Sequence, residues 1–214
     1  MYKHILFDFD GTVFDTVEGI SKSARYAINK FGLDDSLEFL RQFAGPPLVD
    51  KFMEVYGFTK EQAEQATLYF KERYQPIGLY ECRIFPGMKE MLTRLKAAGF
   101  VLGIATSKPQ HLAEKLLAGE DMIELFDAIC GSGVAGNNDS KESVLRRAME
   151  MLGATTEDSV LVGDTKYDVI GAKACGIDCI GVRFGYAAEG ELEQAGATYI
   201  VDDMAELEKL IMGK

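Results

Sequence analysis

Residues 5–12 read Ile-Leu-Phe-Asp-Phe-Asp-Gly-Thr, and this stretch decides how the rest of the chain is interpreted. Its first three residues form a short apolar run typical of a buried strand. Because alternate residues of a strand share a face, Asp8 and Asp10 can lie close together where the strand ends. Two neighbouring carboxylates repel each other unless a cation or a proton lies between them. The pair indicates a Mg²⁺ site, since this ion prefers carboxylate and phosphate oxygens; solvated acids at a strand end are the alternative.

Length and charge restrict the class of protein. The chain has 214 residues, enough for one large domain or for a core with a small inserted domain. Its net charge of −11 disfavours nucleic acid and anionic membranes as partners. A small phosphorylated metabolite stays compatible with this charge, because a metal ion and one or two lysines can reverse the potential locally. No apolar run approaches the roughly 20 residues of a membrane helix.

The cysteines and the first residues point to the cytoplasm. Cys82, Cys130, Cys175 and Cys179 form no Cys-x-x-Cys pair, and two of them fall in apolar runs. Free thiols in a reducing compartment are therefore the expected state. The sequence starts directly with a strand pattern and shows no signal-peptide pattern. We expect a cytoplasmic location, while the oligomeric state stays open between monomer and homodimer.

Residues 15–83 have the pattern of a small helical domain. Apolar residues at helical spacing predict helices within 20–31, 37–43, 48–56 and 59–70. Thr59-Lys60-Glu61-Gln62 fits a capping box at the start of the last one. A turn at Gly45-Pro46-Pro47 separates two of these helices, and no strand pattern interrupts the region.

The remainder of the chain alternates strands with helices. Short apolar runs predict strands at 101–105, 128–130, 160–162, 179–182 and 199–201. Helical spacing between and after these runs predicts the covering helices. Continuous apolar strands alternating with helices are typical of a parallel sheet covered on both faces. We therefore expect an α/β fold, a doubly wound parallel sheet formed by residues 1–14 and 84–214, with residues 15–83 inserted as a helical domain.

Polar residues follow several of these strands directly. Thr106 and Ser107 follow the second strand, Asp164 and Asp168 follow the fourth, and Lys141 opens the helix after the third. Each has an ordinary structural explanation, such as a helix cap or a surface lysine. Ligands of open α/β sheets bind outside the carboxyl ends of the strands, however, so these groups are expected to converge on Asp8 and Asp10.

Taken together, these residues resemble the four motifs of the haloacid dehalogenase superfamily. The motifs are Asp8-Phe9-Asp10-Gly11-Thr12, then Thr106 with Ser107, then Lys141, and finally the segment Gly163-Asp164-Thr165-Lys166-Tyr167-Asp168. They occur in the family's order, and the strand and helix pattern resembles that family over essentially the whole chain. The helical insert is similar to the cap of its phosphoglycolate phosphatase-like branch. Within it, Gly45-Pro46-Pro47-Leu48 resembles a group described as 5′-nucleotidase-like or phosphoglycolate phosphatase-like.

The resemblance implies a Mg²⁺-dependent phosphatase that acts on a small phosphomonoester. Asp8 would attack phosphorus and form an aspartyl-phosphate, and Asp10 would serve as general acid and then general base. Mg²⁺ would be held by Asp8, the backbone carbonyl of Asp10 and Asp164, with Asp168 orienting this shell. The phosphate oxygens would be bound by Lys141, by a hydroxyl and backbone amides at Thr106 and Ser107, and by amides near Gly11.

Other functions stay open from the sequence. A phosphomutase of the β-phosphoglucomutase type shares this core, although Gly163-Asp164-Thr165 lacks the Glu-Asp pair typical of that relative. Haloalkanoate dehalogenases lack an acid at the position of Asp10. A non-enzymatic receiver-like phosphoacceptor shares aspartyl phosphorylation but carries no helical insert. The run from Gly131 to Gly136 matches Gly-x-Gly-x-x-Gly, but no helix follows it at once, so a loop leading to Lys141 is expected instead of a dinucleotide site. Lys22, Arg25 and Lys108 could reach a substrate, but charged residues on helix faces are usually solvated, so a surface position is the expectation for each.

Overall fold

The computed structural model describes residues 2–133 and 140–213, and the chain folds as two compact units. One unit comprises Met1–Phe14 and Ile84–Lys214, and the other comprises Asp15–Arg83. Two two-residue strands, β2 (Phe14–Asp15) and β3 (Arg83–Ile84), pair where the chain passes between the units. These strands were not expected from the sequence, because two residues carry no periodicity.

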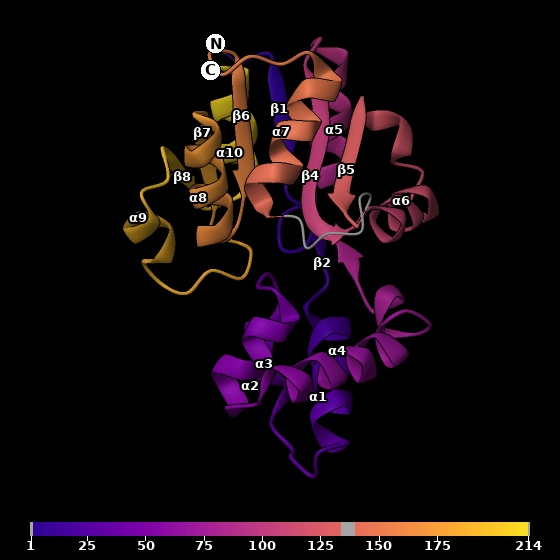
Figure 1. Ribbon diagram of the computed structural model, residues 1–214. Coiled ribbons are helices and arrows are strands. Elements are labelled where there is room, and N and C mark those ends of the chain that lie inside the picture. The colour runs from indigo at the N-terminus through magenta and orange to yellow at the C-terminus, as the bar shows by residue number, and fades with distance from the viewer. Residues whose placement is uncertain (1, 134–139, 214) are drawn as a thin grey trace. The chain divides into compact units, whose positions relative to one another are not determined.

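The larger unit is built on a six-stranded parallel sheet with the order β5-β4-β1-β6-β7-β8 (Figure 1). The strands are β1 (His4–Phe7), β4 (Val101–Pro109), β5 (Ala128–Ser132), β6 (Ser159–Gly163), β7 (Asp178–Val182) and β8 (Tyr199–Val201). Every residue of β1 and of β6 is buried. Burial on both faces explains why these strands are apolar without alternation. The predicted doubly wound parallel sheet is confirmed.

Helices cover both faces of this sheet. Helices α7 and α8 pack against each other on one face, and α5 and α10 lie together on the other (Figure 1). The helices of this unit are α5 (Met88–Ala97), α6 (Gln110–Gly119), α7 (Lys141–Leu152), α8 (Lys166–Cys175), α9 (Glu191–Ala195) and α10 (Met204–Met212), with a 3₁₀ turn at Ile123–Leu125. Between the sheet and α7–α8, residues such as Leu6, Leu161 and Leu145 form a fully buried core. None of the helices within residues 2–133 and 140–213 has the length and hydropathy of a membrane span.

The smaller unit is helical, with an aromatic core. Its helices are α1 (Val17–Asn29), α2 (Leu37–Leu40), α3 (Leu48–Tyr56) and α4 (Lys60–Tyr74), with 3₁₀ turns at Arg41–Phe43 and Gly78–Tyr80. Phe43 lies 4.8 Å from Phe52 between ring centroids, and Phe31 lies 4.7 Å from Phe58. Thr59 and Gln62 form the predicted capping box at the start of α4. Packing between the aromatic rings stabilises these short helices, which would be only marginally stable in isolation.

Candidate active site

The site lies at the carboxyl end of the sheet, where the strand order reverses. β1 is central, and Phe7 is in register with Ile104 of β4 on one side and Val162 of β6 on the other. Asp8 follows Phe7 directly, and Asp164 follows β6. The chain leaves neighbouring strands toward opposite faces at such a position, which opens a crevice for ligands.

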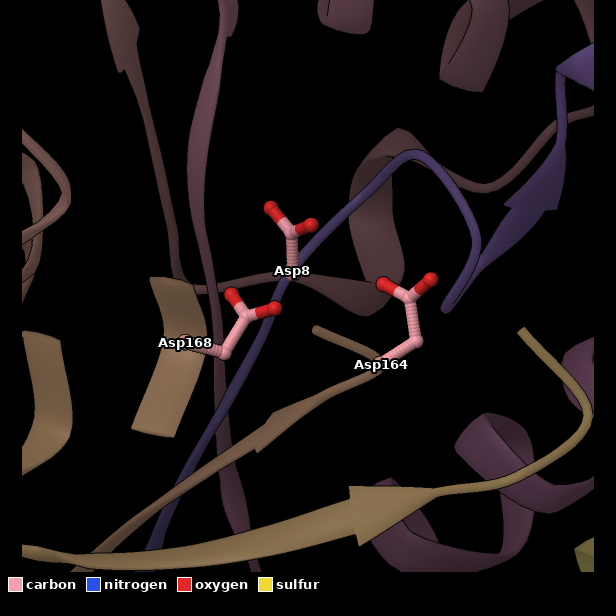
Figure 2. A group of neighbouring side chains, drawn as sticks. All are labelled: Asp8, Asp164 and Asp168. Carbon is pink, nitrogen blue, oxygen red and sulfur yellow. The ribbon is translucent and has the colours of Figure 1, made fainter. Parts of the chain in front are cut away.

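Three carboxylates meet there. One oxygen from each of Asp8, Asp164 and Asp168 can be chosen so that all three lie within 4.8 Å of one another. Figure 2 shows them coming from the end of β1, the end of β6 and the first turn of α8. Asp8 is 8% exposed, Asp164 is 0% and Asp168 is 1%. Three buried acids at this separation are costly unless cations accompany them.

Asp164 is held by hydrogen bonds from two other segments. The Thr12 hydroxyl donates to Oδ1 at 3.1 Å, and the Tyr186 backbone N–H donates to Oδ2 at 2.8 Å. Two glycines allow these segments to lie so close to Asp164. A Cβ atom added at Gly185 would lie 2.2 Å from the Cβ of Asp164, and one added at Gly11 would lie 2.1 Å from its Oδ2. The loop after β7 therefore helps to position Asp164, which the sequence did not suggest.

Asp168 has one oxygen occupied by the helix that carries it. Its Oδ2 accepts from the backbone N–H of Thr165 at 3.0 Å and from the Thr165 hydroxyl at 2.9 Å. These bonds fix the side chain at the start of α8. Its Oδ1 lies 2.7 Å from Nζ of Lys141.

Lys141 is the cation within the acidic cluster. It is the first residue of α7, which Ser140 caps, and its side chain is 8% exposed. Nζ lies 2.5 Å from Asp8 Oδ1, 2.7 Å from Asp168 Oδ1 and 2.9 Å from the Ala105 carbonyl oxygen. Burial acts to lower the pKa of this ammonium group, but Asp168 and Asp8 outweigh it, so the pKa is raised. Lys141 is therefore charged at neutral pH.

The acids have pKa values that reflect their crowding. Burial raises the pKa of Asp8 to about 6, with Lys141 opposing the shift and Asp168 adding to it. Burial also raises the pKa of Asp164 well above its ordinary value, and the charges of Asp168 and Asp8 increase the effect. These directions show that one lysine does not balance three buried carboxylates.

The cluster fits a divalent cation. Three carboxylates and one ammonium group leave an excess of two negative charges when all are ionised, which one divalent ion would neutralise. All three acids supply oxygen ligands, and Mg²⁺ and Ca²⁺ bind oxygen in preference to nitrogen or sulfur. Asp8, Asp164 and Asp168 are therefore the residues that can hold such an ion.

Asp10 pairs with a different lysine from the one that contacts Asp8 and Asp168. Its Oδ1 is 2.9 Å from Nζ of Lys108, whose side chain is 3% exposed. The expectation that Lys108 is a solvated surface lysine is therefore wrong. The apolar run that predicted the second strand ends at residue 105, whereas β4 continues to Pro109 and includes Lys108, which is buried.

The other three residues expected to bind phosphate, Gly11, Thr106 and Ser107, also lie at the carboxyl end of the sheet. Thr106 and Ser107 lie in β4 beyond Ile104, the partner of Phe7 in β1. Thr106 is buried and its Oγ1 accepts from the Lys108 backbone N–H at 3.1 Å, whereas Ser107 is exposed. Gly11 has φ of +86°, in the left-handed region that favours glycine.

The Gly-rich run after β5 is described only in part. Gly131, Ser132 and Gly133 belong to the described residues, while 134–136 lie outside them. A Cβ atom at Gly131 would lie 2.5 Å from the backbone nitrogen of Gln110. This glycine therefore serves the packing of β5 against the start of α6, which requires no dinucleotide.

Comparison with known proteins gives the family. The family model described as haloacid dehalogenase-like hydrolase matches residues 5–182. The chain is 37% identical to a 5′-nucleotidase from Pseudomonas aeruginosa over 98% of this chain and 96% of the relative. It is 32% identical to the tyrosine-protein kinase PtkA from Mycobacterium tuberculosis over 92% of this chain and 67% of that protein.

A solved structure agrees with these matches. The crystal structure of a predicted phosphatase from Clostridium acetobutylicum has a TM-score of 0.95 and 41% identity, and all of both chains is covered. The resemblance inferred from the four motifs is confirmed. The chain belongs to the haloacid dehalogenase-like hydrolase family.

Proposed function

We propose that the protein is a Mg²⁺-dependent phosphatase that hydrolyses a small phosphomonoester through a phosphorylated Asp8. The observation that carries this proposal is that Asp8 contacts Lys141 and lies beside two further buried acids. A carboxylate that approaches an anionic phosphate needs positive charge beside it. When bound by Asp8, Asp164 and Asp168, a divalent ion would supply that charge and polarise a phosphate oxygen.

The first step transfers the phosphoryl group to the protein. An Asp8 carboxylate oxygen forms a bond to phosphorus as the bond between phosphorus and the alcohol oxygen breaks. Asp10 gives its proton to the departing oxygen, which leaves as the alcohol. Lys141 remains beside Asp8 and balances charge on the transferring group, and amides at Gly11 and Ser107 with the Thr106 hydroxyl are proposed donors to it.

The second step returns Asp8 to its first state. A water molecule attacks phosphorus, Asp10 takes a proton from that water, and the bond between phosphorus and Asp8 breaks to release phosphate. Asp10 thus ends protonated and ready for the next substrate. The backbone carbonyl of Asp10 is a further proposed metal ligand, in addition to the three carboxylates.

We propose two candidate classes of substrate. The similarity to a 5′-nucleotidase supports a nucleoside 5′-monophosphate, and the family branch suggested by the insert makes phosphoglycolate the other candidate. We propose that the helical unit of residues 15–83 acts as the cap that selects between them. A cytoplasmic location and a small-molecule substrate belong to the same proposal.

The test is phosphate release from a panel of phosphomonoesters with Mg²⁺ and with a chelator. We expect release by the wild-type protein and by Glu150→Gln, an exposed control on α7. We expect none with chelator, and at least about a thousandfold loss in Asp8→Asn, because the nucleophile is removed. Full activity of Asp8→Asn would refute the proposal. Sugar-phosphate isomerisation would favour a mutase, and stable phosphorylation without turnover would favour a phosphoacceptor module.

The similarity to a tyrosine-protein kinase makes transfer to a tyrosine hydroxyl a second candidate function. The tyrosine oxygen would then form the new bond to phosphorus and lose its proton to Asp10, while ADP leaves from ATP. Incubation with ATP, Mg²⁺ and a tyrosine-containing polypeptide distinguishes the two functions. Phosphotyrosine formation in excess of free phosphate would favour the kinase, and free phosphate alone would favour the hydrolase.

A further inference from the structure

The two acids of the Asp8-Phe9-Asp10 motif have different lysine partners. Asp8 Oδ1 lies 2.5 Å from Lys141 Nζ, and Asp10 Oδ1 lies 2.9 Å from Lys108 Nζ. Both lysine side chains are more than nine-tenths buried. Burying an ammonium group costs free energy unless an anionic partner accompanies it. Lys108 and Asp10 therefore hold each other's side chain in position.

The end of β4 fixes Lys108 in this position. Between Ala105 and Pro109, β4 advances four residues, while its partner β5 advances two between Cys130 and Ser132. Such a bulge re-aims the side chains around it. Ser107 is exposed and Lys108 is buried.

Local contacts also restrain Lys108. Its backbone N–H donates to the Thr106 hydroxyl at 3.1 Å. Its Nζ lies 5.6 Å from the centroid of the Phe9 ring, which is itself stacked on Phe14 at 4.8 Å. An ammonium group over a buried aromatic face is attracted to it. The charge of Lys108 is therefore held in place beside the motif before any ligand is present.

We propose that Lys108 is a positioning residue that acts through Asp10. It holds the Asp10 carboxyl group away from the cluster of Asp8, Asp164 and Asp168, where this group would compete for the cation. When Asp10 gives its proton to the departing alcohol oxygen, the carboxylate that remains faces Lys108 Nζ and is stabilised there. This role rests on the proposed phosphatase function, in which Asp10 is the general acid.

The test compares two substrates that differ in their need for an acid. The p-nitrophenolate of p-nitrophenyl phosphate leaves without protonation, whereas the alkoxide of an alkyl phosphate such as glycerol 2-phosphate does not. The measured quantity is kcat/KM, because it covers the steps only up to release of the alcohol. The proteins are wild type, Lys108→Met, Lys108→Arg, and Lys209→Met as a control at an exposed position of α10.

We expect Lys108→Met to lose at least about tenfold more kcat/KM on the alkyl phosphate than on p-nitrophenyl phosphate, since a general acid contributes about 10²- to 10⁴-fold. Lys108→Arg keeps the charge but not the geometry, so a smaller loss with the same substrate preference is expected. It also provides the test if Lys108→Met does not fold. Lys209→Met should match wild type on both substrates.

Equal losses on the two substrates would overturn the proposal, because Lys108 would then bind phosphate or support the fold. In that outcome the activity of the wild-type protein leaves the phosphatase function standing. A wild-type protein without activity on these two substrates and on the whole panel of phosphomonoesters, in the presence of Mg²⁺, would overturn both proposals together.

Discussion

Asp8 lies in surroundings that oppose its ionisation, although the proposed chemistry requires its carboxylate. It is buried, and Asp168 repels its charge, so its pKa is raised to about 6 in spite of Lys141. Catalytic groups often have such displaced pKa values, because sites that exclude water and gather charge also favour reaction. The same displacement makes cation binding at this residue depend on pH.

We expect Mg²⁺ to bind less tightly below about pH 6. A carboxylate must be ionised to bind the metal, and the metal-free protein holds a proton on Asp8 below its raised pKa. The proton on Asp8 alone predicts that the apparent dissociation constant rises about tenfold per pH unit below that point, and the raised pKa of Asp164 makes this rise steeper. Isothermal titration calorimetry between about pH 5 and 7.5 measures this, and an affinity that does not vary over this range would contradict the assignment of Asp8 as a ligand.

At the scale of elements, α7 and α8 form the site through their mutual packing. Gly171, in the middle of α8, lies against the side chain of Lys141 at the start of α7. A Cβ atom at Gly171 would lie 2.7 Å from Lys141 Cγ and 3.1 Å from its Cβ. The glycine therefore leaves space for the lysine that reaches Asp8 and Asp168.

The variant Gly171→Ala tests whether this glycine is needed to place Lys141, because alanine favours the helix itself but would crowd the lysine side chain. Helix propensity alone would stabilise the variant by about 1 kcal/mol. We nevertheless expect kcat/KM to fall about tenfold to a hundredfold, because a displacement of the order of 1 Å at a catalytic group costs this much. Gly119→Ala in α6 is the control, since nothing lies within 4 Å of its Cβ position. If the two variants retain equal activity, the packing argument is wrong.

The sequence predicted the sheet and that its acidic residues would converge at one edge, for a physical reason. Asp8 and Asp164 follow apolar strands directly, and Asp168 lies in the first turn of the helix that comes next. Parallel strands bring their carboxyl ends to one edge of the sheet. That pattern is local, so it can be read from a single stretch at a time. Lys141 followed from the same pattern, as the start of a helix.

What the sequence did not predict depends on contacts between distant segments. Lys108 was missed because a β-bulge extends β4 to Pro109, beyond residue 105, where the predicted strand ended. The amide of Tyr186 reaches Asp164 from a loop 22 residues away. Neither contact leaves a periodic pattern in the sequence from which it could be predicted. Helix α9, with five residues, was also too short to show helical spacing.

At the scale of the whole molecule, the larger unit stores unfavourable charge that a metal ion would relieve. Three buried acids share one lysine, so the metal-free protein retains an electrostatic cost in its folded state. A ligand that binds only the folded state raises its stability in proportion to its affinity. Activity and stability should therefore respond to the same ion.

We expect Mg²⁺ to raise the free energy of unfolding by about 2.7 kcal/mol at a hundredfold excess over its dissociation constant. Asp164→Asn should lose most of this stabilisation, because it removes one charged ligand from the cluster. Thermal or urea unfolding with Mg²⁺ and with chelator measures the difference, and Glu150→Gln serves as the control. Equal stabilisation of Asp164→Asn and wild type would place the ion elsewhere.

The central claim is that Asp8 carries the phosphoryl group, and its most direct test is acid-quenched mass spectrometry of the protein during turnover. Asp10→Asn with p-nitrophenyl phosphate and Mg²⁺ should accumulate the intermediate, because this substrate needs no general acid while the attacking water lacks its base. We predict one added phosphoryl group on the peptide that contains Asp8, and none in Asp8→Asn. Phosphate release by the wild-type protein with no phosphorylated protein in Asp10→Asn, or with the phosphoryl group on another residue, would contradict the account.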